Sequence, residues 1–494
     1  MLKRENQGIK NRLIQSAGPA GKNTIAVFSL LLIDLLAVGV SIQFAFALRG
    51  FFFPMHLPAI FSDALLANTL HLLWWFPLAF IFCLAYEKLY IQRIPFWVEA
   101  ERIARACTLA LFMAIAFIYL TGIATFVSRS IVLMIWFMTL FLIPTFRFYG
   151  KKLLLSLKIW NRPLVLLGDR KAASQVFGAL KRETNMGYEL MGFINTGRQK
   201  KSATSILPCL GPLLNAETII QELNGPDLII TAPGLSIKEL VKLTARFQPL
   251  VNNIMVVPDL FGMSLNSMDI SYFFEEQAIL LHVKNRLRST LNRAIKRCFD
   301  IAFGLGLLSL SLPIFLVIAI AIKFDSPGPV FYINQRIGQG FRNFQLYKFR
   351  TMYTNAEEIL MERLATCPES CWEWQKFKKL KNYDPRVTRT GRLLRRFSLD
   401  ELPQLINILR NEMSFVGPRP YLPIEAEMLG HFSQDILITK PGLTGLWQIS
   451  GRNNLTFDSR LRLDTWYVKN WSLWLDIILM LKTIKVIVKA EGAY

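Results

Sequence analysis

Two adjacent acids, Asp400 and Glu401, open an apolar helical pattern in the segment SLDELPQLINILRN, which covers residues 398–411. A carboxylate here could attack phosphorus, and its neighbour could hold a hard cation such as Mg²⁺. By spacing alone a structural role is favoured, because Ser398 followed three residues later by Glu401 matches a helix capping box. The catalytic interpretation gains support from the cations just upstream, which would attract phosphate: Arg392, Arg395 and Arg396.

A second basic motif, YKFRTM, covers residues 347–352. If it forms a strand, Lys348 and Arg350 point to one face and Phe349 to the other. Two cations on one face could clamp a diphosphate. The alternative is an ordinary solvated strand edge.

Three further segments carry residues that suit a nucleotide sugar. Arg419 stands between two prolines in SFVGPRP, and this rigid setting suits bidentate phosphate recognition or a simple proline-rich turn. The glycine-punctuated loop KPGLTGLWQISGR contains Trp447 and Arg452, which could bind base or sugar, or form a structured turn. Asp464 follows in a polar stretch with helical character.

The elements that must position these residues begin with membrane segments. Four apolar runs reach the roughly 20 residues that a bilayer requires. They cover residues 24–48, 64–86, 103–126 and 130–149, within a four-helix region at 24–150 that follows a polar tail at 1–23. Asp34 is an isolated acid in the first run, and we expect it to face the other helices because a lone carboxylate in lipid is costly.

The distribution of positive charge predicts the orientation of these spans. The tail and the successive loops carry five, one, four, one and five lysines and arginines. This alternation places the N-terminus and everything after residue 150 in the cytoplasm. We therefore expect a multi-pass protein of the bacterial inner membrane with cytoplasmic catalytic residues.

Residues 161–285 have the pattern of a Rossmann-like α/β domain. PLVLLG at 163–168 predicts a buried strand that leads into a helix, and residues 228–232 and 254–258 predict further strands. The dinucleotide fingerprint is absent, because Asp169, Arg170 and Lys171 follow Gly168 where further glycines would be needed. A regulatory, scaffolding or dimerising role is favoured over cofactor binding.

A fifth apolar segment, residues 298–324, opens the C-terminal domain at 290–494. Cations flank both of its ends, so both ends prefer the cytoplasm, and Pro313 predicts a kink. We expect a re-entrant helix rather than a straight span. Near the chain end, residues 471–489 form an amphipathic helix whose Trp471 and Trp474 would suit a headgroup layer, or an ordinary core-packing helix.

Composition excludes some classes of function. The net charge of +22 would suggest nucleic acid in a soluble protein, but here much of it flanks apolar runs and no nucleic-acid motif is present. The six cysteines form no disulfide framework, and Cys367 and Cys371 lack the further ligands that zinc requires. We therefore expect no nucleic-acid partner.

Five motifs in order resemble the bacterial polyprenyl-phosphate hexose-1-phosphate transferases: KFRTM, SLDELPQLINIL, MSFVGPRP, PGLTGLWQISGR and YVKNWSLWLDI. The four spans and the Rossmann-like insert resemble the large members of that family, so the resemblance covers essentially the whole chain. The stretch WEWQKFKKLKNYDPRVT and the ending EGAY resemble the members that use UDP-galactose. The family's re-entrant helix carries a Ser-Pro break, whereas Leu312 precedes Pro313 here.

The resemblance implies an aspartyl–phosphosugar intermediate, with Asp400 as nucleophile and Glu401 as its partner acid and Mg²⁺ ligand. It implies basic substrate-binding residues at Lys348, Arg350, Arg396 and Arg419, and we add Arg452 and Asp464 to the substrate-binding residues. The expected reaction moves galactose-1-phosphate from UDP-galactose to undecaprenyl phosphate and releases UMP. It would be the first membrane step of O-antigen, capsule or exopolysaccharide synthesis, and we expect a homodimer.

Three alternatives stay open on the sequence. The donor could be UDP-glucose or a UDP-N-acetyl sugar, since no residue can be shown to read the C4 hydroxyl. The chain could be a non-catalytic membrane scaffold for polysaccharide assembly, whose function would survive removal of Mg²⁺. A transporter that uses Asp34 as a coupling group is a third alternative, which leaves the C-terminal motifs unexplained.

Overall fold

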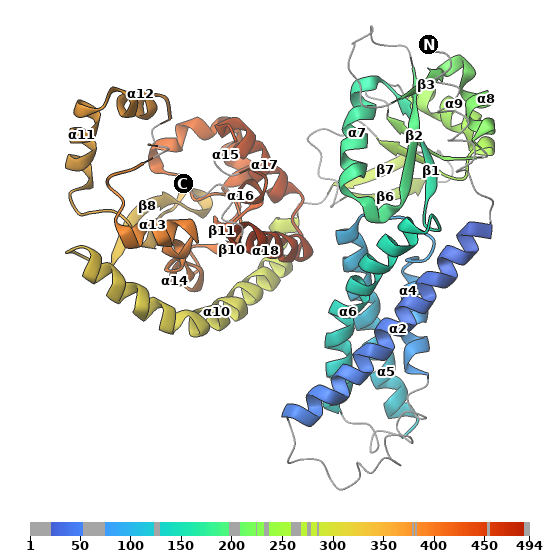
Figure 1. Ribbon diagram of the computed structural model, residues 1–494, viewed down its shortest axis with the longest axis horizontal. Coiled ribbons are helices and arrows are strands. Elements are labelled where there is room, and N and C mark those ends of the chain that lie inside the picture. Colours follow the sequence, from blue (N-terminus) through green and yellow to red (C-terminus); the bar gives the residue numbers. More distant parts are fainter. Residues whose placement is uncertain are drawn as a thin grey trace. The chain divides into compact units, whose positions relative to one another are not determined.

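The computed structural model describes most of the chain and divides it into two compact units, Met1–Asp259 and Leu260–Tyr494 (Figure 1). The described residues are 21–52, 75–122, 129–196, 208–223, 225–231, 237–257, 268–273, 278–283, 286–377, 380, 383–451 and 455–488.

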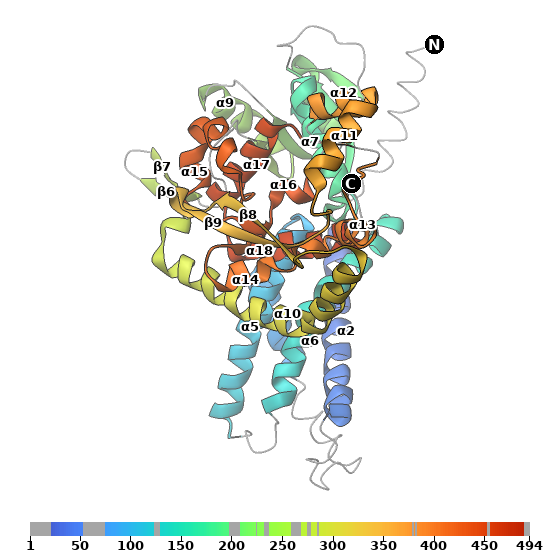
Figure 2. The ribbon, with the colours of Figure 1, turned by 90° about the vertical axis from the view of Figure 1, so that its left-hand side faces the viewer.

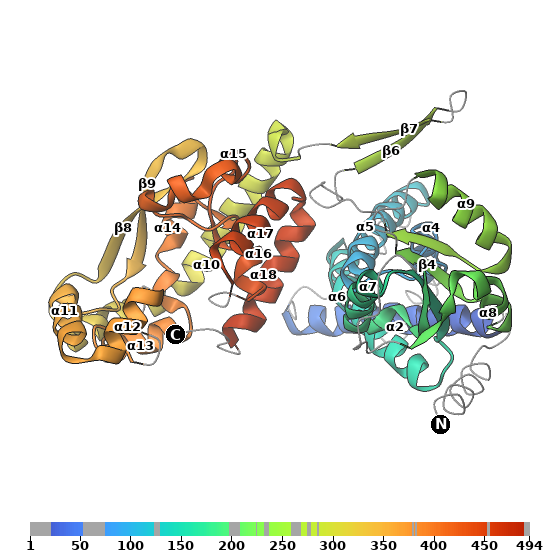
Figure 3. The same ribbon diagram turned by 90° about the horizontal axis from the view of Figure 1, so that it is seen from above.

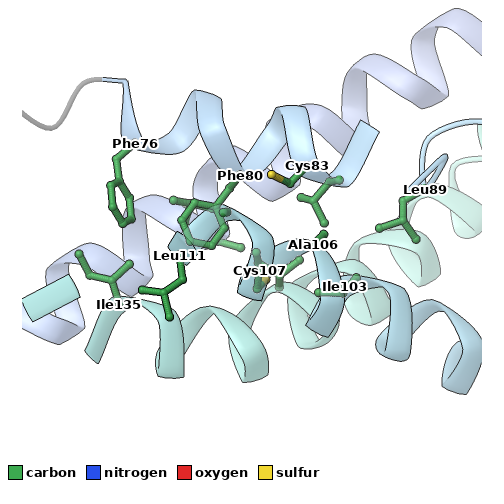
Figure 4. Packing of buried hydrophobic residues seen from close by; sticks show 14 of the residues in the cluster. Phe76, Phe80, Cys83, Leu89, Ile103, Ala106, Cys107, Leu111 and Ile135 are labelled. Carbon is green, nitrogen blue, oxygen red and sulfur yellow. The ribbon is translucent and has the colours of Figure 1, made fainter. Parts of the chain in front are cut away.

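The first unit begins with apolar helices that share one core. They are α2 (Gly21–Phe52), α4 (Phe76–Tyr86), α5 (Phe96–Leu120) and α6 (Arg129–Ser156). Their contact is made by side chains such as Phe80, Cys107 and Ile135 (Figure 4). Helices α2, α5 and α6 are each long and apolar enough to cross a membrane. The structure confirms apolar helices at all four expected positions, although the second expected span is described only from residue 75 onward.

Asp34 faces the interior of this helix group, as expected, and is fully buried there. Its carboxylate accepts two bonds from Arg147, at 2.8 Å and 2.7 Å, and one of 2.6 Å from the Tyr90 hydroxyl. Arg147 also pairs with Glu99 at 2.9 Å, and Lys151 pairs with Glu99 at 2.6 Å. The acid is therefore part of a paired network that joins α2, α5 and α6, which favours a structural role over an ion-coupling one.

We predict that Asp34→Leu lowers the free energy of unfolding by about 3–5 kcal/mol, because it leaves the Arg147 guanidinium buried beside an apolar side chain. Denaturant unfolding of the purified protein in detergent measures this loss. Asp458→Leu is the matched control, since its carboxylate is 60% exposed and pairs with Arg462 on a helix surface. Equal stability of the Asp34 and Asp458 variants would contradict the prediction.

The same unit continues into a five-stranded parallel sheet of order β3-β2-β1-β4-β5. The strands are β1 (Arg162–Gly168), β2 (Tyr188–Asn195), β3 (Cys209–Pro212), β4 (Asp227–Thr231) and β5 (Ile254–Val257). Its helices are α7 (Arg170–Arg182), α8 (Ala216–Glu222) and α9 (Ile237–Phe247), with 3-10 turns at Thr184–Met186, Leu213–Asn215 and Gln248–Leu250. The expected strands at 163–168, 228–232 and 254–258 are β1, β4 and β5.

Alternation along β1 explains the two layers of helices. Leu164 and Leu166 belong to the core shared with α7, whereas Val165 and Leu167 belong to the core shared with α8 and α9. Asp169 occupies the position before α7, and its carboxylate accepts a bond of 2.8 Å from the Thr196 hydroxyl. A dinucleotide pyrophosphate would lie at this helix start, so an acid there disfavours such a ligand.

The second unit combines short strands with helices, and its strand β9 (Asn343–Phe349) lies beside helix α14 (Gln404–Leu409) (Figure 3). Strands β6 (Met268–Phe273) and β7 (Ala278–Val283) form one antiparallel pair, β8 (Phe331–Ile337) and β9 (Asn343–Phe349) another, and β10 (Ser414–Val416) and β11 (Gly442–Thr444) a parallel pair. The helices are α10 (Thr290–Asp325), α11 (Ala356–Thr366), α12 (Pro368–Phe377), α13 (Arg389–Arg396), α14 (Gln404–Leu409), α15 (Ser433–Ile436), α16 (Leu446–Ile449), α17 (Phe457–Lys469) and α18 (Leu473–Val488). Short 3-10 segments lie at Arg286–Arg288, Gln339–Phe341, Leu399–Glu401, Pro423–Glu425 and Glu427–Phe432, the last interrupted at Gly430.

Helix α10 is one continuous helix of 36 residues that bends in its middle part (Figures 1 and 2). Pro313 lies inside it and has no N–H to donate, which accounts for a bend. Ile318 and Ile322 pack against the rest of the unit, whereas Leu310, Leu316 and Val317 are largely exposed. By length and composition α10 is also able to cross a membrane. Its re-entrant course stays a prediction, which the bend and the one-sided burial both favour.

The terminal helix does not place Trp471 at a headgroup layer, so that interpretation is wrong for this residue. Trp471 is buried, and its indole N–H donates to Asp476 at 3.0 Å. Asp476 also accepts from Lys296 at 2.6 Å and from the Tyr467 hydroxyl at 2.7 Å. This network ties α10 to α17 and α18, which explains why the start of α18 packs into the core rather than facing outward.

Candidate active site

Asp400 and Glu401 lie in the 3-10 turn Leu399–Glu401, between α13 and α14. The capping-box alternative is wrong, because the Ser398 side chain makes no capping bond and α14 begins only at Gln404. Ser398 instead adopts a left-handed conformation with φ of 54°, which is uncommon for a residue other than glycine. Such a conformation persists where the surroundings enforce it, often at functional sites. Here it turns the chain sharply just before the two acids.

Lys348 lies between the two carboxylates. Its Nζ is 2.6 Å from Oε1 of Glu401 and 3.8 Å from Oδ2 of Asp400. The side chain of Asp400 is 14% exposed and that of Glu401 30% exposed, so both acids remain reachable from solvent. The structure thus brings together three residues that the sequence assigned to the site.

A buried asparagine fixes the strand that carries Lys348. Asn407 of α14 accepts from the Tyr347 N–H at 3.1 Å and donates to the Gln345 carbonyl at 2.6 Å. These two bonds hold β9 beside α14 (Figure 3), and Asp400 lies just before that helix. Asn407 is fully buried and therefore acts as a positioning residue. This role was not predicted from the sequence, where an asparagine inside an apolar helical pattern is the only signal.

The pKa of Asp400 is shifted toward neutral pH. Burial, helped by the neighbouring charge of Glu401, raises the pKa of Asp400 to about 6, against the lowering effect of Lys348 and Arg395. Burial alone would lower the pKa of Lys348, but Glu401 and Asp400 outweigh it and raise that pKa. Lys348 therefore stays charged and holds the adjacent carboxylates together at neutral pH.

Arg350 does not contact either acid. Strand β9 ends at Phe349, and the Arg350 guanidinium turns to the end of α10, where it donates to the carbonyls of Ser326 and Pro327 at 2.7 Å each. Gly328 makes room for it, because a Cβ there would lie 2.0 Å from Nη1. The expected pairing of Lys348 and Arg350 on one strand face is therefore not formed. The observed contacts of Arg350 cap α10, and diphosphate binding by this residue stays a prediction.

Arg395 rather than Arg396 is the α13 arginine that acts on Asp400. Arg396 is exposed, and its guanidinium lies 5.7 Å from the Phe397 ring. Arg395 is half-buried, donates to the Thr351 hydroxyl at 3.0 Å and lowers the pKa of Asp400. Arg395 and Arg396 are adjacent in the sequence, and their different directions around helix α13 determine that Arg395 faces the acids.

Arg419 and Asp464 meet through the backbone. The Arg419 N–H donates to Oδ2 of Asp464 at 3.0 Å, and the Tyr421 hydroxyl donates to the same oxygen at 2.8 Å. Burial raises the pKa of Asp464 to about 7, and its Oδ1 has no partner among the described residues. Asp464 thus fixes the proline-flanked loop and leaves the Arg419 guanidinium 3.9 Å from Glu425.

Two further arginines, which the sequence analysis did not assign to the site, join Arg419. Arg336 of β8 donates to the Pro420 carbonyl at 3.3 Å, beside Arg419 in the proline-flanked loop. The positive charge of Arg419 lowers the pKa of Arg336 and the charge of Glu401 raises it. Arg460 of α17 and Arg419 both lie over the Trp447 ring, at 5.4 Å and 5.6 Å from its centroid. The Nε atoms of Arg336 and Arg460 are buried without a partner within the described residues. Unsatisfied guanidinium donors beside an aromatic ring suit a nucleotide phosphate.

The two carboxylates suit Mg²⁺, which proteins usually hold with one or two carboxylates together with substrate phosphate oxygens. Glu401 and Asp400 would supply carboxylate oxygens, and the phosphate oxygens of the substrate would supply further ligands. Arg452 lies outside the described residues, and its role stays a prediction.

Comparisons with known proteins identify the relatives of this chain. A family model described as "Bacterial sugar transferase" matches residues 291–490. The undecaprenyl-phosphate galactose phosphotransferase of Salmonella typhimurium is 37% identical over 82% of this chain and 84% of its own length. The UDP-galactose-lipid carrier transferase of Erwinia amylovora is 35% identical over the same shares. A UDP-glucose:undecaprenyl-phosphate glucose-1-phosphate transferase of Xanthomonas campestris is 31% identical over 67% of each chain.

Proposed function

The chain belongs to the bacterial sugar transferase family, and from this premise we propose that it moves galactose-1-phosphate from UDP-galactose to undecaprenyl phosphate. It is a phosphoglycosyl transferase, and transfer of hexose-1-phosphate to undecaprenyl phosphate initiates polysaccharide synthesis. The observation that carries the proposal is the Lys348 ammonium between two adjacent, reachable carboxylates. Three arginines form a second basic group, with Arg419 and Arg460 over the Trp447 ring and Arg336 at the Pro420 carbonyl.

In the first step an oxygen of Asp400 attacks the phosphorus that bears the sugar. The bond from that phosphorus to the UMP oxygen breaks, and UMP leaves with the electron pair. Arg336, Arg419 and Arg460 bind the diphosphate and stabilise the charge that builds up on its oxygens. Glu401 would hold Mg²⁺ together with phosphate oxygens, and when bound the metal neutralises charge on the leaving group.

In the second step an oxygen of the lipid phosphate attacks the same phosphorus. The bond to Asp400 breaks and the carboxylate is restored, so the product is a lipid diphosphate sugar. A covalent intermediate suits an aqueous donor and a membrane acceptor, because each can visit the carboxylate in turn. The proposal places α10 as a re-entrant helix in the cytoplasmic membrane with the site on the cytoplasmic side. The homodimer expected from the sequence stays a prediction.

A donor panel tests this function. The purified full-length chain is given undecaprenyl phosphate and Mg²⁺ with UDP-galactose, UDP-glucose, UDP-N-acetylglucosamine or UDP-N-acetylgalactosamine, and UMP release is measured. UDP-galactose is expected to give the highest kcat/KM. UDP-glucose is the second candidate, because one relative named for glucose transfer is 31% identical. No UMP release with any donor would favour the scaffold alternative.

The rate should depend on pH through Asp400. Only the carboxylate form attacks, and burial raises its pKa to about 6. We expect kcat/KM to fall as the pH drops through about 6, roughly tenfold per further unit. A steady-state pH profile with saturating undecaprenyl phosphate measures this limb. A flat profile down to pH of about 4, the ordinary range of aspartate, would contradict it.

Removal of Mg²⁺ with a chelator should lower UMP release by roughly 100-fold or more, because the phosphate charge would then be balanced by arginines alone. Re-addition of Mg²⁺ is expected to restore the rate. Ca²⁺ serves as the comparison, since it accepts more ligands and a looser geometry. Full activity in the chelator would contradict a metal at Glu401.

A further inference from the structure

A cavity of about 410 Å³ lies in the second unit beside the start of α10, and it shares no residue with the site described above. Its walls come from the first turns of α10, the turn after α14 and the segment before β11. Four basic side chains and one carboxylate line it: Arg293, Lys296, Arg297, Lys440 and Asp300. We propose that this cavity binds the phosphate of an anionic membrane lipid headgroup.

The single acid cannot neutralise the four cations. Oδ1 of Asp300 already accepts from the Ser414 hydroxyl and the Phe415 N–H, at 3.0 Å each. Lys296 is neutralised by Asp476 outside the cavity lining. Arg297 donates to the carbonyls of Ile408 and Leu409, and these neutral acceptors leave its charge in place.

Two further cations, besides Arg297, add to the excess positive charge of the cavity. Among the described residues, the Lys440 ammonium donates to the neutral Asn411 side chain, and Arg293 is exposed. Neither forms a salt bridge with an acid of the described residues. Burial lowers the pKa of Lys440, and Arg297, Lys296 and Arg293 lower it further by repulsion. A phosphate in the cavity would relieve this repulsion and accept from several donors.

The position of the cavity indicates the source of the phosphate. The apolar run of α10 begins at Cys298, directly after Arg297, so the cations lie where an embedded helix meets the headgroups. This step rests on the membrane placement of α10 in the proposed function. The cavity is also connected to the proline-flanked loop that carries Arg419. The Ser414 N–H donates to the Pro441 carbonyl, and the Gly442 N–H donates to the Pro418 carbonyl. A bound headgroup would therefore stabilise the pairing of β10 and β11 next to Arg419.

Native mass spectrometry of the purified full-length protein tests the inference without any donor sugar. The protein is offered phosphatidylglycerol, phosphatidylcholine or inorganic phosphate, and retained ligand is counted. We expect preferential retention of phosphatidylglycerol and a loss of roughly tenfold or more in the variant Arg293→Gln/Lys440→Gln. The charge-preserving variant Arg293→Lys/Lys440→Arg should retain the lipid. Arg462→Gln, which removes an exposed cation of α17, is the matched control.

Several outcomes would overturn the inference. They are equal retention in the neutralised variant, an equal loss in Arg462→Gln, and a loss in the charge-preserving variant. Saturation by inorganic phosphate that displaces phosphatidylglycerol would overturn the lipid as the source. Thermal unfolding of each variant separates misfolding from lost binding, and a folded neutralised variant that keeps its lipid counts against the inference. Lipid retention here and UMP release in the donor panel are separate measurements. A protein that retains phosphatidylglycerol but releases no UMP would refute the proposed function and leave this inference intact.

Discussion

Replacement of Asp400 with asparagine is expected to lower UMP release from UDP-galactose by roughly 10⁴-fold or more, as when a covalent nucleophile is removed. The amide keeps the size of the side chain but cannot form the acyl phosphate. Asparagine and aspartate have nearly the same shape, so the substitution changes little packing at this largely buried position. Its effect should therefore fall on the chemical step, with the binding of UDP-galactose much less affected.

Asp435→Asn is the matched control for this variant. The Asp435 carboxylate pairs with Lys469 at 2.9 Å and is 37% exposed, so its loss should change the rate by less than about twofold. A second measurement addresses the intermediate directly. When UDP-sugar is added without lipid acceptor, mass spectrometry of the acid-quenched protein should find a sugar phosphate on the peptide that contains Asp400. Near-normal turnover of Asp400→Asn, or label on another residue, would disprove the covalent step.

Replacement of Lys348 with methionine should lower kcat/KM by roughly 100-fold to 1000-fold, because it removes the cation that lies between the two acids. It should also move the acid limb of the pH profile. Lys348 lowers the pKa of Asp400, so its removal lets burial and Glu401 raise that pKa above about 6. The carboxylate is then protonated at a higher pH, and the limb shifts upward. A limb that stays in place would show that Lys348 does not act through Asp400.

Two variants separate charge from shape at this position. Lys348→Arg keeps the positive charge and should leave the acid limb near its original pH, even if the longer guanidinium lowers the rate. Lys469→Met removes a lysine from the surface pair with Asp435 and should alter neither rate nor pH profile appreciably. A similar shift in Lys469→Met would indicate a general charge effect rather than a contact with the acids.

Much of the fold followed from local patterns. The apolar helices, three strands of the parallel sheet and the bend of α10 were all predicted, because each depends on the character of one continuous segment. The pairing of Asp34 was also predictable in kind, since an acid among apolar residues must find a partner. Strands β2 and β3 were not predicted, and the sheet order that places β2 and β4 on either side of β1 depends on contacts between distant segments.

For the site, the sequence by itself determined which short motifs matter, and it selected Asp400, Glu401, Lys348 and Arg419. Only the tertiary structure decided which cations act on the acids. The end of β9 at Phe349 sends Arg350 to α10, and the turn of α13 presents Arg395 instead of Arg396. Arg336 and Arg460 join Arg419 from separate elements. A motif fixes a residue's neighbours in the chain, but the direction of a long cationic side chain is set by which distant carbonyls and carboxylates packing brings within its reach.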